Sequence, residues 1–353
     1  ATAECDNLRD LLAQDSAGQA LFADLLAKVN QELKTEGIDG RIHLFKNNLD
    51  SQGNSCGCHE NYLLHRSADF MGMADGLITF FITRQILVGA GQIDENGDYH
   101  FSQRANQIYD PISAATTRAR PIINTRDEPL ADSNQYRRMH VIVGDSNICQ
   151  ATTALKVGMT IALLDALDCS LTLNDLAVAD PMNAIRDINA DLSGLTVLQL
   201  KQGGSSSAVQ IQNSIYQRVM NTLSDAGELE ATRERITVAG CDPLELWGRA
   251  LKCFETQDFS QVNTELDWVI KKNLLEQNAK RLQVAMNSSV ISRLDLAYHD
   301  IGSKGLSPVL EAAGLMRQLI PLKEIETAKT YPPATTRANI RGAILRAAAK
   351  QRK

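Results

Sequence analysis

The spacing of apolar residues changes once along this 353-residue chain, and that change limits the folds available to it. From Arg41 to about Asn147, apolar and polar residues alternate in short runs, with the period of a β-strand. Beyond this point apolar residues recur three and four positions apart, with the period of a helix. Strands grouped first and helices grouped later favour an α+β fold, in which helices cover one face of a largely antiparallel sheet.

The two periods predict individual elements. Strands are expected at 41–47, 59–66, 86–93, 98–104, 118–126 and 138–145. Helices are expected at 7–33, 69–85, 152–167, 182–192, 208–223, 244–255 and 266–284. The Asn96-Gly97 pair is typical of a tight antiparallel hairpin. The linker-like stretches, 201–207 and 329–333, are short, so we interpret the strand-rich part (about 1–148) and the helix-rich part (about 149–353) as one large domain.

The composition is that of a water-soluble globular protein, with 44% hydrophobic and 22% charged residues. A formal net charge of -6, without long blocks of either sign, argues against a general nucleic-acid partner. No membrane span is expected, because the apolar stretch Val157–Leu167 is shorter than the roughly 20 residues that a bilayer needs and contains Asp165. The seven cysteines form no CxxC pair and follow no apolar leader, which is typical of a reduced, cytoplasmic protein.

Polar side chains occupy one parity of several expected strands. Common nucleotide and hydrolase motifs are absent from the sequence: it has no GxxxxGK[ST] loop, GxGxxG, HExxH or GxSxG. Alternation instead places four polar residues on one face of their strand: Arg118, Arg120, Asn124 and Arg126. It also places Arg138 and His140 together, with the apolar residues between and after them on the opposite face.

Taken singly, such residues have ordinary explanations, since strand arginines are usually solvated and a histidine such as His59, at a strand start, is usually solvated or hydrogen-bonded. The segment Cys56-Gly-Cys-His59 is a weak candidate zinc site, because no second cysteine pair stands at zinc spacing. Together, however, several arginines (Arg104 among them) and two histidines on neighbouring strands would repel one another without anions between them. This concentration favours phosphate binding, in which cationic side chains and Mg²⁺ surround the transferring oxygens.

Several segments carry a specific resemblance to a known family. They are 1–6 (Ala-Thr-Ala-Glu-Cys-Asp), 46–48, 53–63, 120–129, 136–147 and 294–301. The sequence resembles the Pup-protein ligases, the proteasome accessory factor family that attaches Pup to lysines, over essentially the whole chain. The related Pup deamidase shares Asn-Thr-Arg-Asp-Glu-Pro at 124–129, but the opening hexapeptide and Gly-Cys-His-Glu-Asn-Tyr at 57–62 are more similar to the ligase.

The resemblance implies a glutamine-synthetase-like fold, whose curved antiparallel sheet cradles ATP and Mg²⁺. ATP would phosphorylate the side chain of Pup's C-terminal glutamate, and a lysine of a target protein would then attack the acyl phosphate. The resulting isopeptide bond would mark the target for the proteasome. The implied site residues are Thr2 as an ATP contact, His59 and His140 on the metal side, and Arg104 and Arg126 as phosphate or transition-state partners. We add Arg138 as a further expected nucleotide contact.

The sequence departs from the family in identifiable places. The family's N-terminal strands, with a metal-binding Glu motif, an Asp base and further Tyr and Glu ligands, would lie before Ala1, and its small C-terminal domain is also expected to be missing. We therefore expect residues 1–353 alone to be an inactive fragment of a working ligase. Cys56 and Leu130 stand where the family usually has Tyr and His.

Two other hypotheses stay open. The first is a Pup deamidase or depupylase of the same fold, and the second is a catalytically inactive Pup-binding protein. Pup is expected to be disordered until bound, so its partner needs a long apolar groove. The segments 266–270 and 294–301, which contain Trp268 and Tyr298, are candidates for that groove unless they are core helices.

Overall fold

A four-stranded sheet organises the first half of the chain in the computed structural model, which describes residues 2–50, 52–66, 69–114, 120–126 and 132–351. Its strand order is β1-β6-β5-β4. β1 (Glu60–His65) pairs antiparallel with β6 (Tyr136–Val141), and β6 pairs antiparallel with β5 (Pro121–Asn124). β4 (Asp110–Ser113) runs parallel to β5. The sheet is thus largely antiparallel, and the predicted α+β class is confirmed.

The hairpin predicted from Asn96-Gly97 is present. It joins β2 (Gln92–Ile93) to β3 (Tyr99–His100), which pair antiparallel. Gly97 has a φ of +92°, a conformation that L side chains rarely adopt. The Asp94 carboxylate closes the turn by accepting hydrogen bonds from the backbone N–H groups of Asn96 and Asp98.

Several strand predictions are wrong or too long. Residues 41–47 contribute only a bridge between Phe45 and Asp300. Residues 86–93 begin as a helix, α3 (Gln85–Val88), because a short, fully buried apolar run cannot be assigned to strand or helix from periodicity alone. The strand expected at 98–104 stops at His100, and among the described residues of the strand expected at 118–126 only β5 is extended in the sheet.

The helix predictions are confirmed apart from small shifts in their bounds. The predicted helices are α1 (Leu8–Thr35), α2 (Phe70–Thr83), α4 (Gln150–Asp168), α5 (Pro181–Ala190), α6 (Ala208–Asp225), α8 (Pro243–Thr256) and α9 (Asp267–Leu282). The others are α7 (Leu229–Ile236), α10 (Ser289–Tyr298), α11 (Ser307–Ala312), α12 (Leu322–Ala328) and α13 (Arg337–Gln351). The stretch 201–207 is not a linker, because it forms the turn and second strand of a hairpin between β7 (Val197–Gln199) and β8 (Ser205–Ser207).

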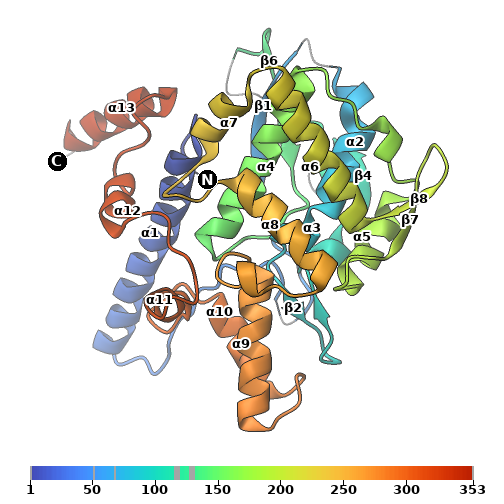
Figure 1. The fold of residues 1–353 in the computed structure, drawn as a ribbon. Helices are drawn as coiled ribbons and strands as arrows, with labels where there is room; N and C mark the ends of the chain where they lie inside the picture. Colours follow the sequence, from blue (N-terminus) through green and yellow to red (C-terminus); the bar gives the residue numbers. More distant parts are fainter. Residues whose placement is uncertain (1, 51, 67–68, 115–119, 127–131, 352–353) are drawn as a thin grey trace.

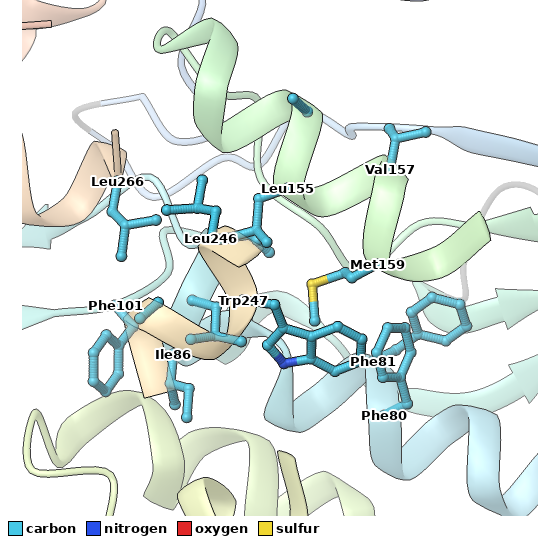
Figure 2. Close-up of a cluster of buried hydrophobic side chains, with 14 of the residues drawn as sticks. Phe80, Phe81, Ile86, Phe101, Leu155, Val157, Met159, Leu246, Trp247 and Leu266 are labelled. Atoms are coloured by element: carbon cyan, nitrogen blue, oxygen red, sulfur yellow. The ribbon is translucent and has the colours of Figure 1, made fainter. Parts of the chain in front are cut away.

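One hydrophobic core joins the two halves of the chain. It contains buried residues of the sheet, such as Ile123 and Val141, and buried residues of the later helices, such as Leu155 and Trp247. Figure 2 shows Trp247 beside Met159, Phe80 and Phe81. In the whole molecule, α4, α6 and α8 lie together in the body, while α1, α12 and α13 run along one side (Figure 1).

One helical stretch, Phe70–Val88, is long and apolar enough to cross a membrane by length and composition. In the folded chain, 78% of the apolar window within Phe70–Val88 is buried inside the protein. This burial is typical of core helices.

Candidate active site

Two histidines from neighbouring parts of the sheet meet at its polar face. His59 directly precedes β1, and His140 lies in β6 opposite Asn61. His59 Nδ1 lies 2.7 Å from His140 Nε2, so one imidazole donates a hydrogen bond to the other. Burial, with the positive charges of Arg138 and of a protonated His59, lowers the pKa of His140 to about 4. The pKa of His59 is also lowered by burial and by nearby arginines, so both rings are neutral at neutral pH.

The buried guanidinium of Arg104 lies beside this histidine pair. Its side chain belongs to the irregular segment after β3 and is 2% exposed. Arg104 Nη1 donates to the carbonyl of Ile142 at 2.6 Å, whereas its Nε has no hydrogen-bond partner among the described residues. A Cβ built on Gly57 would overlap His59 Nε2 and would lie 3.5 Å from Arg104 Nη1, which shows how closely the three residues converge.

A polar row crosses three strands next to this group. His140 pairs with Asn61 of β1 on one side and with Asn124 of β5 on the other. Met139 and Val141, on the opposite parity, are buried in the core. The alternation of polar and apolar residues predicted for this strand is therefore present.

Three further arginines lie around the row. Arg138 Nε donates to Asn61 Oδ1 at 2.7 Å, and its charge acts on both histidines. Arg120 Nη1 donates to Gln107 Oε1 at 3.2 Å. Arg126 is exposed, and its backbone N–H donates to Asn124 Oδ1 at 2.9 Å, which ties it to the end of the polar row.

Other expected site residues are not part of this group. Thr2 is exposed ahead of α1, and no contact joins it to the histidines or to Arg104 in the described part of the chain. Arg118 and Leu130 lie outside the described residues. No group of three or more His, Cys, Asp or Glu side chains placed to hold a metal occurs within the described ranges, so Cys56 and Cys58 do not form the zinc site considered above.

Of the two candidate groove segments, 266–270 is buried throughout, whereas 294–301 is only partly buried, with Leu296 39% exposed. Trp268 is 2% exposed and Tyr298 is 1% exposed. Tyr298 donates its hydroxyl hydrogen to Asp267 Oδ1 at 2.5 Å. The apolar pattern of 266–270 therefore reflects packing inside the protein.

Sequence reasoning missed the buried polar groups that hold the site. Arg84 donates to both carboxylate oxygens of Glu60, at 3.0 and 2.6 Å, and Tyr62 donates to the same carboxylate at 2.6 Å. Burial alone would raise the pKa of Glu60, but the Arg84 guanidinium holds it below its usual value. This pair fixes the start of β1 beside His59. Asp145 is the other missed group. It follows the strand that carries His140, and the sequence marks it only as a polar residue just after a buried strand.

Comparisons with known proteins support a common origin. A family model described as Pup-ligase protein matches residues 1–353. The chain is 45% identical over 357 residues to the Pup–protein ligase of Jonesia denitrificans, covering 100% of this chain and 76% of that protein. It is 45% identical over 352 residues to the Pup–protein ligase of Mycolicibacterium smegmatis, covering 99% and 76% respectively.

Two solved structures are similar along nearly the whole chain. One is the Pup ligase PafA of the prokaryotic ubiquitin-like modification pathway in complex with ADP, with a TM-score of 0.89 and 40% identity over 99% of this chain and 76% of that one. The other is the complex of the prokaryotic ubiquitin-like protein Pup with its ligase PafA, with a TM-score of 0.89 and 39% identity over 99% and 71%.

Proposed function

Because the chain belongs to the Pup-ligase protein family, we propose that it performs the ATP-dependent ligation of Pup to lysine side chains of target proteins. The observation that carries this proposal is its 45% identity to Pup–protein ligases over its whole length. A relative of the same fold has been solved with Pup and another with ADP, which supports Pup as partner and ATP as energy source. The relatives carry the name of the ligase, so the deamidase hypothesis is not favoured.

The reaction proceeds in two balanced steps. The γ-phosphoryl group of ATP passes to the side-chain carboxylate of Pup's C-terminal glutamate, giving an acyl phosphate and ADP. The neutral amine of a target lysine then attacks the acyl carbon and gives up one proton to solvent, inorganic phosphate leaves with the electron pair of the broken C–O bond, and an isopeptide bond forms. Both steps place negative charge on phosphate oxygens, so fixed cationic donors lower their barriers.

Arg104 is our first choice for a phosphate partner. A buried guanidinium is costly unless its charge and N–H groups are satisfied. Arg104 Nε is unsatisfied in the described structure, and an anion bound beside His59 would satisfy it. We assign Arg138 and Thr2 to the nucleotide and Arg126 to the transition state as further proposals that rest on the family resemblance.

Mg²⁺ fits this group in part. It usually keeps several waters and binds phosphate oxygens together with one or two protein groups. His59 and His140 are neutral, as metal-binding imidazoles must be, and would supply protein ligands, although carboxylates are the more usual choice. When bound, the ion would neutralise charge on the phosphates.

We also propose that residues 1–353 act as one catalytic domain, because a shared core unites the strand-rich and helix-rich parts. A cytoplasmic location, with a functional link to the proteasome, agrees with the seven free cysteines. The partners are then Pup and lysine-bearing proteins rather than nucleic acid or membrane.

The decisive experiment compares two forms of Pup. The full-length protein is incubated with ATP, Mg²⁺ and a lysine-bearing protein, either with Pup ending in glutamate or with Pup ending in glutamine. A ligase forms conjugates from the glutamate form at once. Conversion of the glutamine form to glutamate without conjugates would identify a deamidase, and binding of Pup without ATP turnover would identify an inactive Pup-binding protein.

Removal of Arg126 tests the transition-state assignment. Arg126→Ala is expected to lower kcat by about 10²-fold or more, the scale for loss of one transition-state donor. Stability should change little because the side chain is exposed. Arg9→Ala, which removes another exposed arginine that pairs with Glu324, serves as the control. Unchanged turnover of Arg126→Ala would remove this residue from the site.

A further inference from the structure

One buried carboxylate holds the backbone that carries Arg104. The segment Ser102–Arg104 leaves the sheet after β3, so its N–H groups need partners elsewhere. Asp145, which is 2% exposed, accepts from the backbone N–H of Gln103 at 3.0 Å and of Arg104 at 3.2 Å. It also accepts from the Ser102 hydroxyl at 3.0 Å and from the N–H of Ala90 at 2.9 Å.

Asp145 is itself held firmly. The Lys156 ammonium group, on buried α4, donates to the Asp145 carbonyl at 2.8 Å. On the other side, a Cβ added to Gly144 would lie 2.9 Å from Glu60 Oε1, so the backbone here is in close contact with the Glu60–Arg84 pair. These contacts fix the position of the Asp145 carboxylate, which in turn holds the backbone of Ser102–Arg104.

The stretch 140–145 also contacts the guanidinium group of Arg104. The carbonyl of Ile142 accepts from Arg104 Nη1, and His140, two residues earlier, bonds to His59. Residues 140–145 thus hold the Arg104 backbone at one end, its guanidinium at the other, and the histidine pair beside it.

The carboxylate of Asp145 does not form an ion pair with the Arg104 guanidinium within the described ranges, because it is occupied by backbone and hydroxyl donors. Burial lowers the pKa of Arg104 from its usual value, and the negative charge of Asp145 opposes part of that effect. The arrangement leaves Arg104 Nε without a hydrogen-bond partner in the described structure and so available for a ligand.

We propose that Asp145 is a positioning residue of the ligase, which acts on the phosphoryl-transfer step by fixing the Arg104 guanidinium. This inference rests on the function proposed above for Arg104. It assigns Asp145 no contact with substrate.

Asp145→Asn is the first test. The amide has the same shape but only one acceptor oxygen, so it cannot accept all four hydrogen bonds. We expect kcat to fall about 10- to 100-fold, the scale for displacement of a catalytic group by about 1 Å. The KM for Pup should change little.

A double-mutant cycle with Arg104→Lys separates positioning from a purely structural role. If Asp145 acts through Arg104, the double variant will be about as slow as Arg104→Lys alone, because the group to be positioned is already altered. Ser102→Ala, which removes one donor to Asp145 and one acceptor of the Arg104 N–H, is a milder second variant in case Asp145→Asn fails to fold. It should lower kcat a few-fold and couple to Arg104→Lys in the same way.

Asp191→Asn is the matched control. Asp191 also accepts two backbone N–H groups and two hydroxyl hydrogens, from Ser193 and Thr196, but has no hydrogen bond to the Arg104 segment. Its effect on kcat should be small and additive with Arg104→Lys. Chemical unfolding of every variant separates loss of stability from loss of rate.

The outcomes are distinct. Additive losses for Asp145→Asn and Ser102→Ala with a slow Arg104→Lys would show that Asp145 only stabilises the fold, and would leave the function of Arg104 intact. A normal rate for Arg104→Lys would overturn the assignment of Arg104 itself, and the positioning role with it. Coupled losses support the proposal.

Discussion

At the scale of single residues, the site depends on close approaches that leave no room for added atoms. Gly57→Ala places a methyl group where His59 Nε2 now lies. The ring must move, so we expect a weaker Mg²⁺ dependence and a lower kcat with little loss of stability. A Mg²⁺ titration of activity measures this, with Gly40→Ala, where nothing lies within 4 Å, as the control. An unaltered titration would mean that His59 does not bear on the metal.

A second buried histidine gives a prediction for stability against pH. His299 Nδ1 bonds to the Lys46 carbonyl, and its Nε2 lies 2.9 Å from Lys271 Nζ and 3.0 Å from Gln103 Nε2. Burial, and then the charge of Lys271, lowers its pKa well below the usual value. The unfolded chain therefore binds the extra proton first as the pH falls below about 6.5, so this residue's contribution to folding stability declines with falling pH.

The measurement is urea unfolding between about pH 7.5 and pH 5.5, a range that brackets the unfolded pKa. Wild-type protein should lose stability across this range more steeply than His299→Gln, which has no titrating ring. Equal slopes for the two proteins would show that His299 is not held neutral in the folded state.

At the scale of elements, α6 offers a clean test of local stabilisation. Its first turn has a capping box, in which Ser207 Oγ accepts from Gln210 N–H and Gln210 Oε1 accepts from Ser207 N–H. Ser207→Ala should lower the free energy of unfolding by about 1 kcal/mol, because one helix N–H loses its partner. Ser205→Ala, at an exposed position of the same strand, should cost far less. Equal costs would argue against the cap.

The helices were predictable from sequence because each has one apolar face, and that pattern survives small errors in the bounds. The strand-rich half was harder, since Gln85–Val88 is buried on every side and strands such as β3 have only two residues. In the site, the alternation of polar and apolar residues along the strand was enough to place His140 on a polar face. The roles of Gly57 and Asp145 could not be predicted, because they depend on segments far apart in sequence coming into contact.

At the scale of the whole molecule, the shared core predicts one cooperative unfolding transition. Ile123→Ala in the sheet and Leu155→Ala in α4 each remove fully buried side-chain atoms. Each should lower stability by about 2–5 kcal/mol and shift the same single transition. Circular dichroism and tryptophan fluorescence, followed together in urea, check this. Two separated transitions, one for each half, would contradict the single catalytic domain.

The stretch from His140 to Asp145 ties the histidine pair and the buried arginine to one short length of backbone. If the histidine pair binds the metal and Arg104 binds phosphate, as we propose, any engineered shift of that backbone would alter metal preference and nucleotide binding at the same time. Attempts to retune the enzyme for another nucleotide should leave these six residues untouched and vary positions on facing segments instead.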